Sequence, residues 1–309
     1  MNQTPDDLAA SYAYCRHLSA HAGSNFHAGF LLLPRHKRQA MDVLYAFMRH
    51  TDDLADGPGD EANRCEALAT WREQLAQLTS ASTHLPQHSK ILPALADVVR
   101  RYQIPLEHLY AVIDGVAMDL AGTRYATFEE LERYCHRVAS AVGLACLYIW
   151  GFRGPEAFEP ARQLGVAMQL TNILRDLKPD AESGRCYLPE ADLHMTGYSL
   201  EDLRAGKDNQ AFRSLMGMEL GHARRLYEQG AELWDHLEPD GRRILGFMFS
   251  TYRALFRKIG HRPASVLHGP VRLSRLKKLA ILVRWSLLPP RKSSLLAILL
   301  AACCTGFGV

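Results

Sequence analysis

The stretch YAFMRHTDDLAD at residues 45–56 combines helix-forming spacing with three closely placed carboxylates. On a helix, Asp52 and Asp56 lie four residues apart on one face, and Asp53 lies three residues before Asp56. These carboxylates repel one another, and only Arg49, four residues before Asp53, offers a positive charge at helical spacing. A divalent cation is the usual partner of acidic groups crowded in this way, so the stretch predicts a metal-binding helix, with an exposed acidic helix as the alternative.

A second stretch, QLTNILRDLKPD at residues 169–180, has the same character on a more apolar background. Asn172, Asp176 and Asp180 are spaced by four, so a continuous helix would align their oxygens in one stripe. The neighbouring apolar side chains are Val166, Met168, Leu170, Ile173, Leu174 and Leu177. Unpaired carboxylates are costly to bury, so this stripe needs a partner. Two such helices packed side by side would turn five carboxylates and one amide toward a common cavity.

Oxygen ligands of this kind favour Mg²⁺, with Mn²⁺ as the alternative, because hard cations prefer oxygen ligands and often bridge to the phosphates of a substrate. The cysteines and histidines form no competing zinc-binding pattern. Arg49, Arg175 and Arg185 are candidates for holding a diphosphate, although each has an ion pair with a neighbouring aspartate as its alternative. Residues 184–189 follow the second stretch directly, and their glycine and arginine predict a flap over the metal site.

Helical periodicity dominates the rest of the chain, without sustained strand-like alternation or a fixed-period repeat. Pro105, Pro155 and Pro239 stand where first turns should begin, and Thr127 with Glu130 forms a capping-box arrangement. No linker long enough to separate two domains is visible, so one all-helical domain is the simplest interpretation. The expected helices lie near residues 5–20, 35–55, 61–79, 89–102, 105–121, 127–150, 156–178, 208–237, 239–259 and 271–288.

The composition of the 309-residue chain fits a globular protein, since 48% of its residues are hydrophobic and 22% are charged. Disordered chains have fewer apolar residues, and a net charge of +3 is too small for a protein that coats nucleic acid. The seven cysteines include no C-x-x-C pair, and the first fifteen residues contain neither a basic region nor an apolar run. We therefore expect a cytoplasmic protein without a signal peptide, a disulfide scaffold or a nucleic-acid partner.

Positive charge is concentrated near the C-terminus. Between Arg253 and Lys292 the chain has eleven Lys or Arg residues and no Asp or Glu, interleaved with apolar side chains and Trp285. This pattern fits peripheral contact with the anionic inner face of a membrane. The alternative is a core-facing helix with a basic outer side. The final stretch, LLAILLAACCTGFGV at residues 295–309, is apolar, but at about 1.5 Å per residue it is too short to span a bilayer. We expect a helical domain at residues 1–290 and a basic-then-apolar tail at 291–309.

Taken together, these motifs resemble the squalene/phytoene synthase family. The matching pieces keep the family's order: YAFMRHTDDLAD at 45–56, MDL at 118–120, YCHRVASAVG at 134–143, AMQLTNILRD at 167–176, GRCYLP at 184–189 and RLSRLKKL at 272–279. The resemblance implies an all-α, single-domain helical bundle of the isoprenoid synthase type around a central apolar channel. It also implies a Mg²⁺-dependent transferase that joins two prenyl diphosphates head to head through a cyclopropylcarbinyl diphosphate.

The resemblance also assigns roles to residues. The implied metal ligands are Asp52, Asp53, Asp56, Asn172, Asp176 and Asp180. The implied catalytic residues are Tyr45, Arg49, Tyr134, Arg185 and Tyr187. Together with the basic and aromatic candidates from the pattern itself, the expected substrate-binding residues are Phe26, Arg49, Gln169, Asn172, Arg175, Arg185 and Tyr252.

Two departures from the family pattern bear on these assignments. Pro179 stands where the family usually has an acidic residue, and a proline inside a helix removes a hydrogen bond to the carbonyl four residues back. We therefore expect a kink or helix end near Asp180, the least secure ligand. The family's Ser-x-Ser-Phe stretch reads Gly23-Ser24-Asn25-Phe26 here, which weakens the diphosphate contacts expected at that point.

The chemistry implied by the resemblance requires a dry apolar cavity, because an allylic carbocation must meet the second substrate before it meets water. The candidates for its lining are Phe26, Phe30, Tyr45, Phe47, Val138, Val142, Leu144, Met168, Phe247 and Tyr252, with ordinary core packing as the alternative for each. No G-x-G-x-x-G motif is present, so we expect no NADPH site.

Two motifs, YCHRVASAVG and RLSRLKKL, favour farnesyl diphosphate as substrate and presqualene diphosphate or squalene as product. The alternative is a phytoene synthase of carotenoid biosynthesis that acts on geranylgeranyl diphosphate. A third hypothesis, from another class, is a non-catalytic, membrane-associated assembly factor of the same fold. Such a relative should lose cluster carboxylates, whereas this chain keeps five aspartates and Asn172.

Overall fold

Long helices account for most of the chain in the computed structural model, which describes residues 5–21, 27–78, 89–288 and 290–293. The helices longer than ten residues are α1 (Pro5–His21), α3 (Arg35–Ala55), α4 (Glu61–Ala76), α5 (Leu92–Tyr102), α6 (Leu106–Leu120), α9 (Phe158–Arg175), α13 (Gln210–Gly230), α15 (Pro239–His261) and α16 (Arg275–Leu287). The shorter ones are α2 (His27–Phe30), α7 (Phe128–Cys135), α8 (Ala141–Trp150), α10 (Leu177–Glu182), α11 (Glu190–Thr196), α12 (Leu200–Arg204) and α14 (Leu233–His236). Within these ranges the only β-type pairing is an isolated bridge between Phe152 and Leu237, which confirms the all-α prediction.

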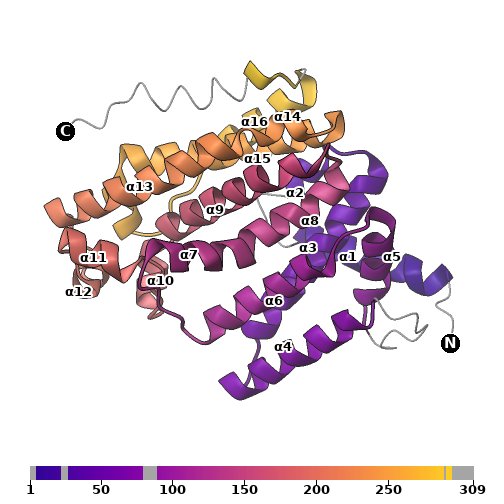
Figure 1. Ribbon diagram of the computed structural model, residues 1–309, viewed down its shortest axis with the longest axis horizontal. Helices are drawn as coiled ribbons and strands as arrows, with labels where there is room; N and C mark the ends of the chain where they lie inside the picture. The colour runs from indigo at the N-terminus through magenta and orange to yellow at the C-terminus, as the bar shows by residue number, and fades with distance from the viewer. Residues whose placement is uncertain (1–4, 22–26, 79–88, 289, 294–309) are drawn as a thin grey trace.

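Helix α9 occupies the centre of the bundle. It lies between α13 and α15 on one side and α7 and α8 on the other (Figure 1). Residues on all sides of α9 are buried, including Leu164, Val166, Leu170 and Leu174. Because neighbouring helices bury most of α9, the second acidic stretch at its C-terminal end is held within the bundle.

Helix α3 brings the first acidic stretch to the same centre. It has the bounds that the sequence predicted and buries one face through Met41, Val43, Leu44 and Phe47. That face packs against α1, α5, α6 and α8. The amphipathic pattern of α3 therefore directs its last turns, which carry the aspartates, along the bundle interior.

The helix expected at residues 127–150 is interrupted. Its middle five residues, His136–Ser140, form a π-helical segment between α7 and α8. Glycines allow this segment to pack closely on both sides: a Cβ on Gly115 would lie 2.5 Å from Val138 Cγ1, and one on Gly165 would lie 2.5 Å from Ser140 Cα. The single-helix prediction was wrong here because this π-turn is stabilised by close packing against α6 and α9 rather than by a local sequence signal.

The expected helix 156–178 ends earlier, at Arg175. Asp176 has φ −106° and ψ 15°, and α10 begins immediately after it. Pro179 has no N–H with which to bond the Arg175 carbonyl, so the interruption predicted from this proline is confirmed. The Asp180 N–H still donates to the Asp176 carbonyl at 3.0 Å, which keeps Asp180 close to the second stretch.

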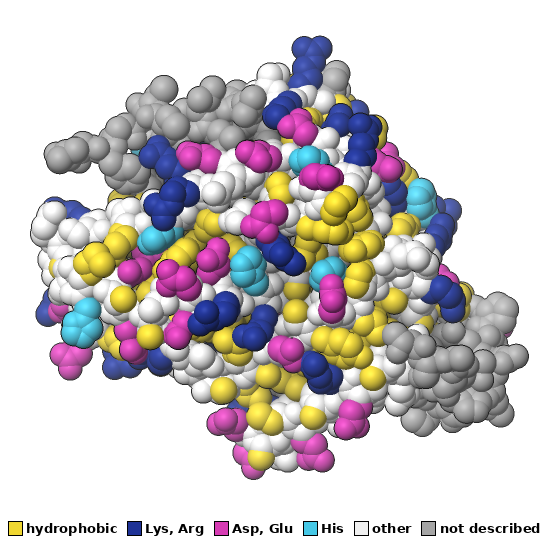
Figure 2. Space-filling model, viewed as in Figure 1, with side chains coloured by type: hydrophobic (Ala, Val, Ile, Leu, Met, Phe, Trp, Pro, Cys, Tyr) yellow, Lys and Arg dark blue, Asp and Glu magenta, His cyan; other side chains and the backbone are white. Residues whose placement is uncertain are grey.

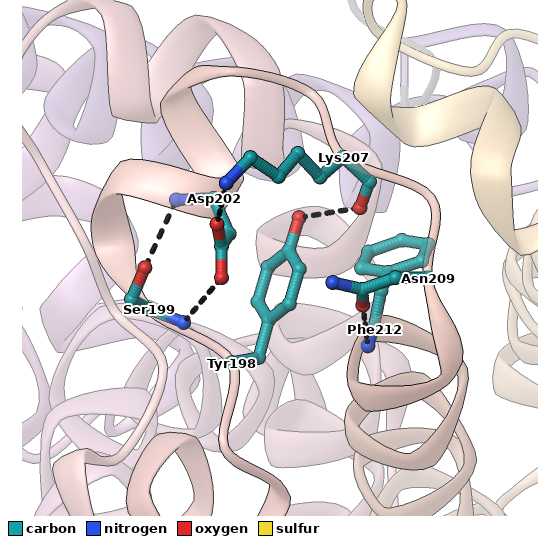
Figure 3. A network of polar contacts seen from close by, with 6 residues as sticks. All are labelled: Tyr198, Ser199, Asp202, Lys207, Asn209 and Phe212. Atoms are coloured by element: carbon teal, nitrogen blue, oxygen red, sulfur yellow. Dashed lines mark hydrogen bonds and ion pairs between the residues drawn. The ribbon is translucent and has the colours of Figure 1, made fainter.

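The connection from α11 to α13 was not predicted from the sequence. Ser199 and Asp202 form a reciprocal capping box at the start of α12, and Tyr198 donates to the Lys207 carbonyl at 3.0 Å (Figure 3). Asn209 accepts from the Phe212 N–H at 2.9 Å and so caps α13. The capping box expected at Thr127 was wrong in part: Thr127 is the N-cap residue of α7, but its side chain makes no capping bond.

The surface carries both signs of charge. On the face shown in Figure 2, acidic and basic side chains are interspersed. Among the described helices, none combines the length and the hydropathy needed to cross a membrane. Phe26 and residues 294–309 lie outside the described residues, so the expectations for them, including the boundary near residue 290, stay predictions.

Candidate functional site

A cavity of about 360 Å³ lies between α3, α8, α9 and α15. Most of its wall is apolar, and its aromatic and aliphatic lining comprises Phe30, Met41, Met48, Val138, Val142, Cys146, Trp150, Leu164, Met168, Leu233, Leu245 and Met248. Its polar lining comprises Tyr45, Arg49, Asp52, Gln169, Asn172 and Tyr252. One residue of each predicted ligand cluster, Asp52 and Asn172, borders this cavity. Asp53, Asp56, Asp176 and Asp180 are not part of its lining, so the expected common cavity for all six groups stays a prediction. Phe47, Leu144 and Phe247 are buried but do not belong to the lining, so the expectation for these three was wrong.

The first cluster occupies the last turns of α3. Arg49 pairs with Asp53 at 2.7 Å, one turn away. Burial, together with the charges of Asp56 and Asp119, raises the pKa of Asp52 to about 6, although Arg49 opposes the shift. Positive groups near Asp52 therefore do not balance the negative charge around it. A bound cation would stabilise the charged form of this carboxylate.

The second cluster is held by Arg175. Its Nη1 donates to Asn172 Oδ1 at 3.0 Å and its Nε donates to Asp176 Oδ1 at 2.9 Å. Burial and the charge of Asp176 raise the pKa of Asp180 to about 6, and Arg185 opposes the shift. The structure thus shows the ion-pair alternative for Arg49 and Arg175, and both arginines lie beside predicted metal ligands.

Asp119 on α6 joins the two clusters, and the sequence reasoning missed it as a site residue. Its oxygens accept hydrogen bonds from the Tyr134 hydroxyl at 2.8 Å and the Tyr187 hydroxyl at 2.9 Å. The charge of Asp119 raises the pKa of both Asp52 and Asp180, so it lies within electrostatic range of each cluster. The signal was present in the MDL motif at 118–120, which was used only for the resemblance.

Tyr134, Tyr187 and the predicted flap at residues 184–189 lie together beside the Asp119 carboxylate. The rings of Tyr134 and Tyr187 stack with centroids 5.4 Å apart, and burial raises the pKa of both hydroxyls, which keeps them protonated as donors. Gly184 adopts φ +81°, a left-handed conformation that favours glycine. The turn brings Arg185 to the cluster: its N–H donates to the Asp180 carbonyl at 2.8 Å, and its charge lowers the pKa of Asp119 and Asp180 against the effect of burial.

A second cavity, of about 450 Å³, adjoins the second cluster. It is lined by Arg175, Asp176 and Tyr252 together with the segment from Pro270 to Leu273 and Lys278. Arg272 and Lys278 therefore contribute positive charge beside the acidic groups. The sequence reasoning treated the whole basic run as a surface feature and missed these two, although both belong to the RLSRLKKL motif.

No three acidic, histidine or cysteine side chains of the described residues converge into a ready-made metal site. The donor set nevertheless fits a hard cation: burial and the neighbouring carboxylates raise the pKa of Asp52 and Asp180, so added positive charge relieves repulsion. Mg²⁺ commonly takes one or two carboxylates and completes its shell with water and substrate phosphates. A converged protein cage is therefore not required.

Comparison with known proteins agrees with this geometry. The family model for squalene/phytoene synthase matches residues 19–277. The chain belongs to the squalene/phytoene synthase family. It is accordingly a prenyltransferase, and the prediction of the family and of its isoprenoid synthase fold is confirmed.

Individual relatives cover almost the whole chain. A phytoene synthase from Arthrospira platensis is 34% identical over 293 residues, covering 91% of this chain and 94% of that protein. A 15-cis-phytoene synthase from Synechococcus elongatus is 35% identical over 260 residues, covering 80% and 83%. Among solved structures, squalene synthase HpnC from Alicyclobacillus acidocaldarius has a TM-score of 0.77 at 27% identity, covering 87% of this chain and 98% of that one. A dehydrosqualene synthase with bound ligand has a TM-score of 0.78 at 26% identity, covering 91% and 96%.

Proposed function

We propose that this prenyltransferase joins two molecules of geranylgeranyl diphosphate head to head and forms phytoene. The observation that carries the proposal is that relatives named phytoene synthase match the chain at 34% and 35% identity over most of its length. The preference for farnesyl diphosphate, drawn from two motifs, has less support, since the squalene-type solved structures are 26% and 27% identical. The alternative of a phytoene synthase is thus the better one.

The residues of the chain divide the chemistry between a polar end and an apolar cavity. Mg²⁺ held by Asp52, Asp53, Asp56, Asn172, Asp176 and Asp180, with Asp119 nearby, would supply Lewis-acid stabilisation of the leaving diphosphate. Arg49, Arg175 and Arg185 lie where they can bind phosphate oxygens, because guanidinium groups form paired hydrogen bonds with them. Arg175 then exchanges its bonds to Asn172 and Asp176 for bonds to the substrate.

The apolar cavity protects the reacting chains from water. Its wall of Met, Val, Leu and aromatic side chains offers the prenyl tails no hydrogen-bonding partner, and ring faces such as those of Phe30 and Tyr45 can stabilise positive charge at close range. Tyr134 and Tyr187 keep hydrogen bonds on Asp119 and so orient this carboxylate between the two clusters.

Product identification tests the proposal. The full chain is incubated with Mg²⁺ and either geranylgeranyl or farnesyl diphosphate, and extracted lipids are analysed by chromatography and mass spectrometry. We expect phytoene from geranylgeranyl diphosphate and little turnover of farnesyl diphosphate. Squalene or presqualene diphosphate as the main product would contradict the choice of substrate, and consumption of neither would favour the non-catalytic assembly factor.

A matched pair of variants tests the metal ligands. Asp52→Asn and Asp176→Asn remove one charge from each cluster, and we expect each to reduce turnover at least about a hundredfold while helicity is retained. Asp208→Asn changes an aspartate that pairs with Arg213 away from the cavity, and it should leave turnover unchanged. Full activity in either cluster variant would refute the ligand assignment.

We further propose that the protein is cytoplasmic and peripheral to the membrane through its basic C-terminal third. The support is the run of eleven Lys or Arg residues without an acidic residue between Arg253 and Lys292.

A further inference from the structure

Helix α16 exposes a continuous apolar stripe. The exposed fractions are 80% for Leu276, 55% for Leu279, 44% for Val283 and 76% for Leu287. At 3.6 residues per turn these four positions fall within an arc of about 100° on one side of the helix. Of the eight large hydrophobic side chains exposed in the described part of the chain, these four and Leu288 are five, so the stripe is a local concentration rather than a general property of the surface.

The opposite side anchors α16 to the bundle. Ile281 and Trp285 are 7% and 2% exposed, and Trp285 Nε1 donates to Ser250 Oγ at 2.8 Å. A Cβ on Gly246 of α15 would lie 2.3 Å from the Trp285 ring, so the indole sits directly on the α15 backbone. At the end of the helix, Arg243 donates to the Trp285 carbonyl at 2.8 Å. The stripe therefore belongs to a well-packed helix that faces outward at the edge of the bundle (Figure 1).

Positive charges flank the stripe. Arg275 lies on one side of it and Lys277 and Arg284 lie on the other, by helical spacing, and all three are exposed. Lys292 pairs with Asp235, so we do not include it among the cations that flank the stripe. Leucines between cations are the arrangement of helices that lie in a membrane interface, where the apolar side chains enter the acyl region and the cations meet lipid phosphates.

We propose that α16 docks the protein on an anionic lipid bilayer, with Leu276, Leu279, Val283 and Leu287 inserted below the headgroups. A second copy of this chain fits the face poorly, because a twofold contact through the stripe would bring like charges together. The tail at 295–309 is apolar and uncharged, so it would leave the flanking cations without anionic partners.

The position of α16 also suggests how docking would serve the reaction, an inference that rests on the proposed function. The segment from Pro270 to Leu273, just before α16, and Lys278 within α16 line the cavity that also contains Arg175, Asp176 and Tyr252. Prenyl diphosphates are amphiphiles whose tails partition into lipid, and the hydrocarbon product is insoluble in water. Docking through α16 places the cavity beside the headgroup region, so that substrate enters from the bilayer and product returns to it.

Vesicle flotation of the full chain, without substrate or metal, tests the docking. Vesicles of phosphatidylcholine and phosphatidylglycerol in equal parts should carry the wild-type protein, and vesicles of phosphatidylcholine alone should carry much less. Leu276→Gln with Leu287→Gln, and separately Lys277→Glu with Arg284→Glu, should each lower the partition coefficient at least about tenfold. Leu31→Gln with Met195→Gln is the matched control, because both side chains are exposed, at 57% and 73%, and lie outside α16.

The outcomes separate this proposal from its rivals. Absence of wild-type binding, or undiminished binding by both α16 variants, overturns it, and the second result moves the contact to the tail or another surface. A change of oligomeric state in the leucine variant with vesicle binding retained identifies a second copy as the occupant and also overturns it. Turnover of detergent-dispersed geranylgeranyl diphosphate, measured on the same samples, should equal wild type in every variant. Vesicle binding without any turnover would refute the proposed function and leave the docking intact.

Discussion

At the scale of single residues, Asp119 is the most important site residue that the sequence reasoning did not identify. It lies on neither acidic stretch, yet its charge acts on Asp52 of one and Asp180 of the other. Two tyrosine hydroxyls hold its oxygens at 2.8 and 2.9 Å, so its orientation is determined by side chains from α7 and from the segment after α10. Asp119 therefore links the predicted metal ligands to the tyrosines that the family resemblance assigned to catalysis.

A substitution at this position should affect activity without unfolding the protein. Asp119→Asn keeps the shape and can still accept from one tyrosine, but it removes a negative charge between the clusters. We expect turnover to fall at least about tenfold, with a higher Mg²⁺ concentration needed for half-maximal rate. Steady-state kinetics across a Mg²⁺ series measures both.

Asp114→Asn is the control on the same helix. Asp114 is exposed and pairs with Arg72, and surface pairs contribute little to stability. Asp119 would lose its assigned role if the two variants had the same kinetics.

At the scale of elements, two interruptions of helices shape the site. Asp176 separates α9 from α10, so Asp180 lies on a different helix from Asn172. The π-helical segment His136–Ser140 presents Val138 to the cavity while Tyr134, one turn earlier, bonds Asp119. π-Turns within helices frequently accompany functional sites, and this one changes the register between Tyr134 and the cavity wall.

The close packing of this segment gives a stability prediction. Gly165→Ala would place a Cβ 2.5 Å from Ser140 Cα and 2.8 Å from its backbone nitrogen, where no flexible side chain can give way. We expect the free energy of unfolding to fall by about 1–3 kcal/mol, or more if the segment must move. Urea unfolding followed by circular dichroism measures this change.

Gly217→Ala in α13 is the matched control. No atom lies within 4 Å of a Cβ added there, so alanine should stabilise its helix by up to about 1 kcal/mol. Equal effects of the two substitutions would mean that the close contact at Gly165 does not exist in solution.

At the scale of the whole molecule, a buried acidic pair makes stability depend on pH. Glu219 of α13 is 1% exposed and Asp192 of α11 is 7% exposed. Burial, together with the charge of Asp192, raises the pKa of Glu219 from 4.5 to about 8. In the folded protein Glu219 thus keeps a proton that it releases near pH 4.5 in the unfolded chain.

The sign of the effect follows from that difference. A carboxyl group with a raised pKa stabilises the fold fully below its unfolded pKa, and this contribution is lost as the pH rises through the folded value, about 8. We expect Glu219→Gln to flatten the fall in the free energy of unfolding between pH 5 and 8. Glu228→Gln, at an exposed position on the same helix, should keep the wild-type slope. The account fails if wild type shows no such decline.

The local features of this protein were readable from the sequence because they depend on neighbouring residues. Helix α3 has its predicted bounds, since amphipathic spacing over 35–55 suffices to define it. The break before Asp180 followed from Pro179, whose missing N–H is a covalent property. The two acidic stretches and the family motifs likewise identified the prenyltransferase class without any knowledge of packing.

Only the tertiary structure decided which distant groups meet. Asp119 lies 68 positions from Tyr187, and Arg175 shares one cavity with Arg272 and Lys278, which lie 97 and 103 positions further along the chain. The π-turn depends on close contact with glycines in two other helices. The contact between Trp285 and Gly246 determines which side of α16 faces the solvent. Periodicity shows that a helix has an apolar and a polar face. Which segment covers the apolar face depends on contacts between distant parts of the chain. The separation of two segments in the sequence does not tell how close they lie in space.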